Sequence, residues 1–478
     1  MQSHRNKQSA RSGRQKLAKL DLLKVRLAAM LLLLCGLTAL LAACAGGTAK
    51  SDAVTSPPSS PSTPGAPGSV PSVYFGMNPD VEVLQNPQLA PWPSFTMGSI
   101  RLWGTGTTWA DIEPTSPTPD FTELDNWLSL AKSHGVTNIV YTFGKGTPPW
   151  ISSNPTDSTC TNPESSNQTL GWCDPPSDVD SGDTSFKNFV TAIVQHVAGQ
   201  IGAWECINEP DVPEEWTGTT AQTLTMCTDM YNIVKQYDPS ALVLSPAPAN
   251  GRGGAATGAG KAVPWLTSYL QAGGGKYADV IAFHGYSSPE TDPELVSTLA
   301  QSIVSAASSN GVGSDPVWDT EVGFNNDTDP GDITDPDQQA AFTAVIYLLQ
   351  WSDGISRMFW YSYGNGATGT LTNPGGSLNE AGTAYGVVEQ WMVGSVLTTP
   401  CSASGTVWTC GFKNASGSQV LAVWDSGQSC TGGVCTTSNY SPSATYTQYV
   451  DLAGATHPIS ASNTATAPIG IKPILLEP

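Results

Sequence analysis

Short apolar runs alternate with amphipathic stretches along most of the chain. Eight runs, rich in apolar residues and bounded by Gly, Pro, Asn or Asp, predict strands at 73–77, 99–103, 138–143, 202–207, 241–245, 280–284, 317–321 and 357–361. Helical spacing of apolar residues predicts helices at 121–134, 186–197, 224–237, 265–270, 295–307 and 338–351. This alternation predicts an α/β fold, a closed TIM (β/α)8 barrel over residues 73–394.

The pattern changes from residue 395 onward. Short runs now alternate apolar with polar residues, at 406–412, 420–424, 446–452 and 474–476, and Gly, Ser and Asn separate them. This predicts a small C-terminal β-sandwich over 395–478. A sheet in this place can bind carbohydrate or pack against the barrel, and we expect packing because the sequence shows no strip of aromatic residues.

The first 43 residues have the pattern of an export signal. Eight Lys or Arg precede an apolar run at 27–40, and the following Leu-Ala-Ala-Cys44 resembles a bacterial lipoprotein cleavage site with Cys44 as the lipidated residue. Residues 44–72 are Ser- and Pro-rich and predict a tether. We expect an exported, lipid-anchored protein of the cell envelope, facing the surface or the periplasm. The alternative is an uncleaved anchor, but the apolar run is shorter than the ~20 residues that span a bilayer.

Eight cysteines remain once Cys35 of the signal and the lipidated Cys44 are set aside. An even number in an exported chain predicts disulfides. The natural local pairs are Cys160 with Cys173, Cys401 with Cys410, and Cys430 with Cys435. Cys206 and Cys227 can pair with each other or stay as buried thiols. The cysteines show no metal-ligand spacing, so we expect no metal and no other cofactor.

The net charge narrows the choice of partners. The chain has 20 Lys and Arg against 40 Asp and Glu; removing residues 1–43 takes away eight basic residues and one acidic residue, which leaves 12 against 39, a net charge of −27. Such a protein repels phosphate backbones and anionic membrane surfaces. We therefore expect no nucleic-acid partner, whereas a neutral carbohydrate substrate would not be repelled. We also expect a monomer.

Two of the predicted strands end in a glutamate. Asn208-Glu209-Pro210 follows the strand at 202–207, and Glu321 closes the strand at 317–321, 112 residues further on. The carboxyl ends of barrel strands surround one face, where catalysis takes place. Two carboxyl groups facing each other there suit glycoside hydrolysis, because one protonates the leaving group while the other attacks the anomeric carbon.

The motifs around these acids resemble the large clan of retaining β/α-barrel glycoside hydrolases. They are Asn208-Glu209-Pro210, Glu321, His284-Gly-Tyr286 and Trp360. Within the clan, the chain is most similar to family 39, which includes β-xylosidases and α-iduronidases, through Arg101-Leu-Trp, Trp109-Ala-Asp-Ile-Glu-Pro114 and Thr147-Pro-Pro-Trp150. The chain departs from that family at Met77-Asn78, where family members have a histidine, so we expect a different pocket.

The resemblance implies a role for each matching residue. Glu209 would be the general acid and base, and Glu321 the nucleophile, in a retaining double displacement. The implied substrate-binding residues are Asn208, His284, Tyr286, Arg101, Trp360 and Trp150. Arg101 and Tyr286 would also keep Glu321 ionised, and Asn208 would hold the sugar 2-hydroxyl. The same residue types also serve as buried hydrogen-bond partners or core aromatics.

We therefore predict a retaining glycoside hydrolase that cleaves a poly- or oligosaccharide. The alternatives are a non-catalytic, carbohydrate-binding lipoprotein on the same barrel and a mainly structural envelope protein. Motifs of other enzyme classes are weaker. The glycine-rich run at 251–256 lacks the helix start of a dinucleotide site, and the sequence has no Gly-x-Ser-x-Gly elbow, P-loop or His-Glu-x-x-His.

Overall fold

A computed structural model describes residues 68–478 except 145, 161–169, 250–260, 287–288, 326–331, 365, 367, 444 and 460–465. The predicted signal, Cys44, most of the tether and the glycine-rich run at 251–256 lie outside the described residues. Within the described part of the chain, no helix has the length and apolarity needed to cross a bilayer.

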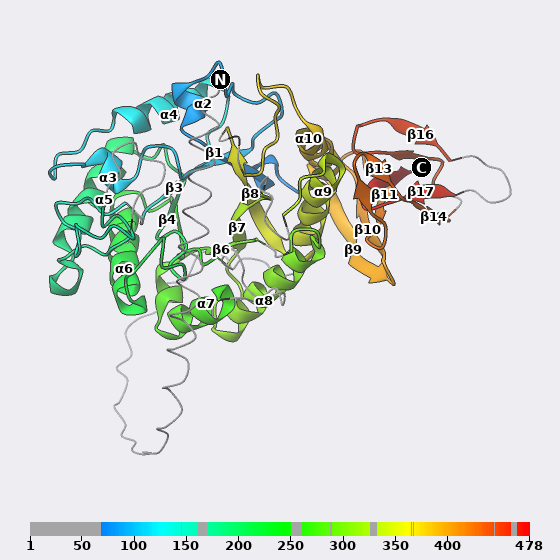
Figure 1. Ribbon diagram of the computed structural model, residues 1–478. Helices are drawn as coiled ribbons and strands as arrows, with labels where there is room; N and C mark the ends of the chain where they lie inside the picture. Colours follow the sequence, from blue (N-terminus) through cyan, green and yellow to red (C-terminus); the bar gives the residue numbers. More distant parts are fainter. Residues whose placement is uncertain are drawn as a thin grey trace, which may run out of the picture. The chain divides into compact units, whose positions relative to one another are not determined.

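The predicted barrel is confirmed (Figure 1). Its strands are β1 (Phe75–Pro79), β2 (Ser99–Leu102), β3 (Ile139–Thr142), β4 (Ala203–Glu205), β5 (Leu242–Leu244), β6 (Ile281–His284), β7 (Val317–Val322) and β8 (Ile355–Tyr363). All neighbours in the order β5-β4-β3-β2-β1-β8-β7-β6 are parallel. An isolated parallel bridge between Leu244 and Val280 brings β5 to β6 and closes the ring.

Helices surround the strands in Figure 1. The longer ones are α4 (Thr122–Ser133), α5 (Thr184–Val197), α6 (Thr220–Tyr237), α7 (Ala262–Gln271), α8 (Glu294–Ser309), α9 (Pro336–Ser352) and α10 (Glu380–Met392). The short ones are α2 (Glu82–Gln85) and α3 (Trp109–Ile112), with 3-10 turns η1 (Ser72–Tyr74), η2 (Val179–Ser181) and η3 (Gly274–Tyr277). The sequence had not indicated α10.

Element ends differ from the expected ones for local reasons. Helix α6 starts four residues before the expected residue 224, because Thr219 caps it in a reciprocal capping box with Gln222. Strand β1 starts at Phe75 because η1 occupies the preceding residues. Strand β4 ends at Glu205, but Asn208 still forms an isolated parallel bridge to Ala247 beside β5. The chain therefore stays against the barrel up to the predicted acid.

Two apolar layers support the barrel. Small and bulky side chains fill its interior, including Val140, Ala203, Ala282, Trp318 and Phe359. A much larger cluster lies between the strands and the surrounding helices. The barrel is therefore a packed core, and its chemistry is confined to the strand ends and the loops that leave them.

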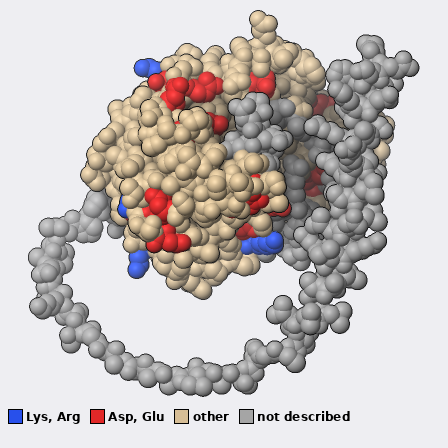
Figure 2. Space-filling view, turned by 60° about the vertical axis from the view of Figure 1, so that its left-hand side comes forward, with Lys and Arg blue, Asp and Glu red and all other residues tan. Residues whose placement is uncertain are grey.

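Acidic side chains stand in several groups on the face shown in Figure 2, whereas basic side chains are few and scattered. This distribution agrees with the excess of acidic residues in the sequence. A surface of this kind favours neutral over anionic ligands.

The C-terminal region forms antiparallel sheets, as the alternating pattern predicted. Six strands pair in the order β16-β15-β18-β11-β10-β9. They are β9 (Val396–Ser404), β10 (Val407–Lys413), β11 (Gln419–Asp425), β15 (Gln448–Val450), β16 (Thr456–Pro458) and β18 (Ile474–Glu477). Two further pairs are β12 (Cys430–Thr431) with β13 (Val434–Cys435), and β14 (Ser438–Tyr440) with β17 (Ala467–Ile469). These strands form the small sandwich.

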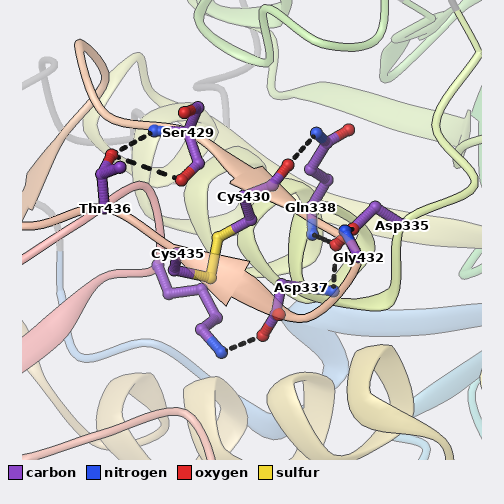
Figure 3. Close-up of a disulfide and its surroundings, with 9 residues drawn as sticks. Asp335, Asp337, Gln338, Ser429, Cys430, Gly432, Cys435 and Thr436 are labelled. Carbon is purple, nitrogen blue, oxygen red and sulfur yellow. Dashed lines mark hydrogen bonds and ion pairs between the residues drawn. A yellow bond between two sulfur atoms is a disulfide. The ribbon is translucent and has the colours of Figure 1, made fainter.

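The sandwich packs against helices of the barrel, as expected. Trp351 of α9 meets Phe412 edge to face, and the Trp424 indole donates to Glu294 of α8 at 3.0 Å. The β12–β13 hairpin lies on the N-terminal end of α9 (Figure 3). There the Gln338 amide donates to the Cys430 carbonyl at 2.7 Å, and the Gly432 amide donates to Asp335 at 2.7 Å. The hairpin thus holds the start of α9. Near the end of the same helix, Gln350 donates to Asp319 of β7.

Four disulfides join cysteines that are close in sequence. The three predicted pairs, Cys160–Cys173, Cys401–Cys410 and Cys430–Cys435, are present. Cys206 and Cys227, which the sequence left open, also form a disulfide. This last bond ties the segment just after β4 to helix α6, immediately before the predicted acid Glu209.

Removing the Cys206–Cys227 bond should destabilise the protein more than removing Cys430–Cys435. The first closes a sequence separation of 21 residues and the second only 5. Chain entropy alone predicts losses of about 3 and about 2 kcal/mol in the free energy of unfolding. Urea unfolding of the two paired Cys→Ala variants measures both, and an equal or smaller loss for Cys206→Ala/Cys227→Ala would contradict this account.

Candidate functional site

The structure brings Glu209 and Glu321 together at the carboxyl ends of the barrel strands. Glu321 lies within β7, and Glu209 follows β4 by four residues. One carboxylate oxygen of each lies within 4.8 Å of the other and of a His284 ring nitrogen. The two acids that the sequence singled out therefore face one another across a gap of molecular size.

Glu209 owes its position to the backbone. Its amide donates to the Ala247 carbonyl at 2.9 Å, which holds it beside the end of β5. Its φ of 42° lies in the left-handed region, which a residue with a side chain rarely adopts. Such conformations persist where the surrounding structure enforces them, and they concentrate at functional sites.

Arg101, on β2, is the fully buried centre of the site. Its Nε donates to Glu205 at 2.7 Å, and one terminal nitrogen donates to Glu321 Oε2 at 3.0 Å. The same nitrogen donates to Asn78 Oδ1 at 3.0 Å, and the other donates to Asn208 Oδ1 at 2.7 Å. Arg101 was predicted to bind substrate; its fully buried side chain instead contacts Glu205, Glu321 and two asparagine oxygens.

Glu205 and Asn78 complete the shell around Arg101, and the sequence analysis missed both roles. Glu205 is fully buried at the end of β4 and also accepts from the Thr142 hydroxyl at 2.8 Å. Asn78 donates to the Thr320 carbonyl at 3.2 Å while its oxygen accepts from Arg101. Asn78 is thus part of the charge network around Arg101.

Tyr286 contacts the opposite oxygen of Glu321. Its hydroxyl donates to Glu321 Oε1 at 2.8 Å, so the carboxylate is held from two sides, by Tyr286 and by Arg101. Burial raises the pKa of Glu321 above its ordinary value, and the charge of Glu209 adds to this. Arg101 and the Tyr286 hydrogen bond lower the pKa of Glu321. The site thus opposes part of the effect of desolvation with two specific partners.

His284 connects the two acids. Its Nδ1 lies 2.8 Å from Glu209 Oε1 and 3.7 Å from Glu321 Oε2, and its Nε2 lies 3.5 Å from an Arg101 nitrogen. Burial lowers the pKa of this imidazole to about 4, so it is neutral above that pH. Because Arg101 can only donate, Nε2 must accept, and the single ring proton sits on Nδ1, directed at Glu209.

Asn208 is buried between Arg101 and a further acid. Its oxygen accepts from Arg101, and its Nδ2 donates to Glu215 Oε2 at 3.3 Å. Its amide is therefore oriented, with the nitrogen pointing away from the guanidinium. This is the orientation in which an asparagine at this place can donate to a sugar hydroxyl.

The prediction that Trp360 stacks on sugar is contradicted by its position. The side chain is fully buried and donates to the Gly369 carbonyl at 2.7 Å. It packs on Phe324 and Phe342, on the outer side of the strand toward α9. The next residue, Tyr361, is partly exposed.

Trp150 and Gly323 serve the loops around the site. Trp150 is half-buried, and its indole donates to the Glu113 carbonyl at 2.8 Å, which anchors the loop after β3. Gly323 lies where two backbone segments approach closely. A Cβ there would lie 1.9 Å from the Tyr361 carbonyl oxygen. Neither residue is among the contacts of the two acids that the structure shows.

Glu209, His284 and Glu321 are also close enough to share a cation. Their facing atoms, however, have protein partners: Glu209 Oε1 with His284 Nδ1, and Glu321 Oε2 with Arg101. A guanidinium already supplies positive charge at this point. The arrangement fits carboxyl-pair chemistry better than a metal centre.

Comparison with known proteins relates the chain to glycoside hydrolases. Residues 181–385 match the family model of the glycosyl hydrolase catalytic core. The fold is similar to that of a family 39 glycoside hydrolase from Bacteroides cellulosilyticus, with a TM-score of 0.60 and 18% identity over 85% of this chain and 81% of that one. No curated protein sequence matches the chain.

Two further solved structures show how widely this fold is shared. One is a monomeric β-xylosidase from Caulobacter crescentus, with a TM-score of 0.56 and 14% identity over 86% of this chain and 98% of that one. The other is a family 51 arabinofuranosidase from Xanthomonas axonopodis, with a TM-score of 0.52 and 10% identity over 86% and 97%. At these identities the likeness concerns the fold.

Replacing Arg101 by methionine should destabilise the protein by about 3–5 kcal/mol, because it leaves two carboxylates buried without their cation. The folded-state pKa of Glu321 then rises further above its unfolded value. Stability is consequently retained at low pH and lost as the pH rises. Urea unfolding of Arg101→Met between pH 4 and 8 measures this.

Two variants accompany that measurement. Arg357 contacts the Trp318 ring at 4.0 Å instead of a buried carboxylate pair, so Arg357→Met should show a smaller and less pH-dependent loss. Adding Glu205→Gln to Arg101→Met should restore part of the stability. A loss that is the same at every pH would contradict the buried-charge explanation.

Proposed function

Because the chain is a glycoside hydrolase with a barrel like that of family 39, we propose that it cleaves O-glycosidic bonds of a poly- or oligosaccharide with retention of anomeric configuration. Glu321 is the nucleophile and Glu209 the general acid and base. The observation that carries this proposal is the approach of the two carboxyl groups to within 4.8 Å.

The spacing favours retention over inversion. Retaining enzymes hold their two carboxyl groups about 5–5.5 Å apart, so that one attacks the anomeric carbon directly. Inverting enzymes need about 6.5–9.5 Å to admit a water between the second carboxylate and the sugar. A separation within 4.8 Å leaves no room for that water.

In the first step a carboxylate oxygen of Glu321 bonds to the anomeric carbon as the bond to the glycosidic oxygen breaks, and Glu209 gives that oxygen a proton. In the second step Glu209 takes a proton from water, whose oxygen displaces Glu321. Arg101 and Tyr286 hold Glu321 in place and favour its ionised form. Asn208, oriented by Arg101, offers its amide nitrogen to the sugar 2-hydroxyl.

The neutral His284 decides where Glu209 carries its proton. Its Nδ1–H donates to Glu209 Oε1 at 2.8 Å, so Oε1 accepts and the acidic proton resides on Oε2. Oε2 is then the oxygen that serves the leaving group. Because the pKa of His284 is about 4, this arrangement persists over the pH range in which Glu321 is ionised.

The structural neighbours suggest a substrate class to test first. The structural neighbours include a β-xylosidase and an arabinofuranosidase. We therefore propose pentose-containing saccharides as the first substrates to test. The acidic surface and the four disulfides fit an exported enzyme acting on a neutral polymer, and lipidation at Cys44 remains a prediction.

Glu321→Ala should lower kcat on a cleavable aryl glycoside by at least about 10³-fold, since no covalent intermediate forms. Added azide should restore turnover and give a glycosyl azide of inverted configuration. Glu209→Ala should respond to azide with a product of retained configuration. NMR of the products distinguishes the two roles.

The exposed Glu214, in the same loop as Glu209, is the matched control, and Glu214→Ala should keep wild-type activity. Wild-type release of an inverted sugar would exclude the retaining mechanism. A protein that binds saccharides but turns none over would instead be the carbohydrate-binding lipoprotein.

Tyr286→Phe should move the acidic limb of the kcat/KM profile to higher pH. In the wild type the hydrogen bond from Tyr286 lowers the pKa of Glu321. Without it, Glu321 needs a higher pH to ionise. We also expect a loss of about 10-fold or more in kcat, because one oriented donor is removed. An unchanged acidic limb would mean that Tyr286 does not act on the ionisation that limits the rate.

A further inference from the structure

Strand β7 contains one extra residue immediately before Glu321. Along β6, Phe283 pairs with Asp319 and the next residue, His284, pairs with Glu321, so Thr320 is the additional residue on β7. The ladder between β7 and β8 also shifts its register at this point. A bulge of this kind bends the strand and changes the direction of the side chains that follow it. The direction of Glu321 therefore depends on what holds the bulge.

The side chain of Asp319 spans this bulge. It is fully buried, and its Oδ1 accepts from the Glu321 amide at 3.3 Å and from the Gly285 amide at 2.9 Å. The Gly285 amide also donates to the Glu321 carbonyl at 2.9 Å. One carboxylate oxygen thus joins the backbones of both strands where the register changes.

Two neighbours keep the Asp319 carboxylate in this place. A Cβ on Gly285 would lie 2.0 Å from Asp319 Oδ2, so glycine at this position lets the carboxylate reach the backbone. Gln350 of α9 is fully buried, and its amide donates to Oδ2 at 2.5 Å. Oδ2 is held by the helix, and Oδ1 is thereby directed at the two backbone amides.

The backbone that Asp319 holds carries groups in contact with both acids. Gly285 lies between His284, whose Nδ1 is 2.8 Å from Glu209 Oε1, and Tyr286, whose hydroxyl donates to Glu321 Oε1 at 2.8 Å. The second amide bound by Asp319 belongs to Glu321 itself. A shift of this backbone would move the Tyr286 hydroxyl and the Glu321 carboxylate relative to one another.

We propose that Asp319 is a positioning residue of the catalytic site, which fixes the bulge of β7 and with it the directions of Glu321 and Tyr286. The inference rests on the proposed function, which gives these two side chains their catalytic roles. Asp319 was not among the site residues predicted from the sequence. Its importance follows from geometry, since a misplacement of about 1 Å can cost ~10²-fold in rate.

The accepting oxygen of Asp319 matters here, and its charge does not. Burial raises the pKa of Asp319 well above its usual range, while the hydrogen bonds from Gln350, Gly285 and Glu321 lower it. A carboxyl group keeps an accepting oxygen in either protonation state. Asparagine has the same oxygen, and the Gln350 amide can present its own oxygen to the asparagine nitrogen. Asparagine should therefore replace Asp319 in this role.

Asp319→Leu and Asp319→Asn separate the accepting oxygen from the charge. Asp319→Leu should lower kcat on an aryl glycoside by about 10²-fold, with little change in KM. It should also move the acidic limb of the rate profile to higher pH, because the Tyr286 hydrogen bond that lowers the pKa of Glu321 is loosened. Asp319→Asn should keep a kcat close to the wild-type value and should not move the acidic limb upward.

A double-mutant cycle tests whether Asp319 acts through Tyr286. In the variant that combines Asp319→Leu with Tyr286→Phe, the loss in kcat should be smaller than the product of the two single losses, because both changes affect the same carboxylate of Glu321. Losses that multiply would mean that Asp319 does not act through this hydrogen bond, and would overturn that part of the inference.

Hydrogen exchange provides a measurement that does not depend on turnover. Mass spectrometry of the peptides that contain Gly285 and Glu321 should show faster amide exchange in Asp319→Leu than in the wild type, and no such increase in Asp319→Asn. If Asp319→Leu does not fold, Gln350→Leu replaces it. That variant removes the partner of Oδ2 and should lower kcat in the same direction by a smaller factor.

Asp353→Leu is the matched control. Asp353 is a partly buried aspartate at the end of α9 that accepts from the Ser297 hydroxyl at 2.6 Å and from the Gln301 amide at 2.8 Å, both on α8. Its loss should lower the free energy of unfolding and leave both kcat and the exchange of the β6 and β7 peptides unchanged.

The outcomes separate this inference from the proposed function. A wild-type kcat in folded Asp319→Leu, or in Gln350→Leu where Asp319→Leu does not fold, would overturn the inference and leave the mechanism standing. Equal losses in Asp319→Asn and Asp319→Leu would also overturn it, because the charge would then be the important feature. If the wild-type protein hydrolyses no glycoside, the proposed function fails, and the exchange rates alone decide whether Asp319 holds the bulge.

Discussion

A single buried guanidinium organises the mouth of this barrel. Arg101 has no access to water, so its charge is stable only because Glu205 and Glu321 lie against it and two asparagine oxygens accept its remaining hydrogens. These partners come from different strands and loops. The fold therefore has to close correctly before the charge is satisfied, and the same contacts set the position of Glu321 and affect its ionisation.

The two acids are held by different means, which suits their different roles. Glu321 is fixed by charge and hydrogen bonds within a strand, and these partners offset part of the burial that raises its pKa. Glu209 is fixed by backbone contacts, by a left-handed conformation and by the disulfide at Cys206. In the proposed mechanism Glu209 loses and regains a proton in each cycle, so its position cannot depend on one charge state. Glu321, the proposed nucleophile, stays ionised until it forms a bond, so its position can.

Sequence patterns predicted the barrel, the meeting of Glu209 and Glu321, and the packing of the sandwich, because these depend on local periodicity and on strand ends. They missed Glu205 and Asn78, since a polar residue in a buried strand gives no sign of its partner on another strand. They also misplaced Trp360. Phe359, Trp360 and Tyr361 are all aromatic, so the run does not reveal which residue faces inward. In the structure Phe359 fills the barrel interior and Trp360 packs outward.

The disulfides have a simple order along the chain. Within the described residues, each cysteine pairs with the next one in sequence, from Cys160–Cys173 to Cys430–Cys435. Eight cysteines allow 105 fully paired patterns, but this one is reached if every thiol joins the first available predecessor. If the chain is oxidised from its N-terminus, pairing in order along the sequence gives this connectivity without any wrong pair that would need to be reshuffled.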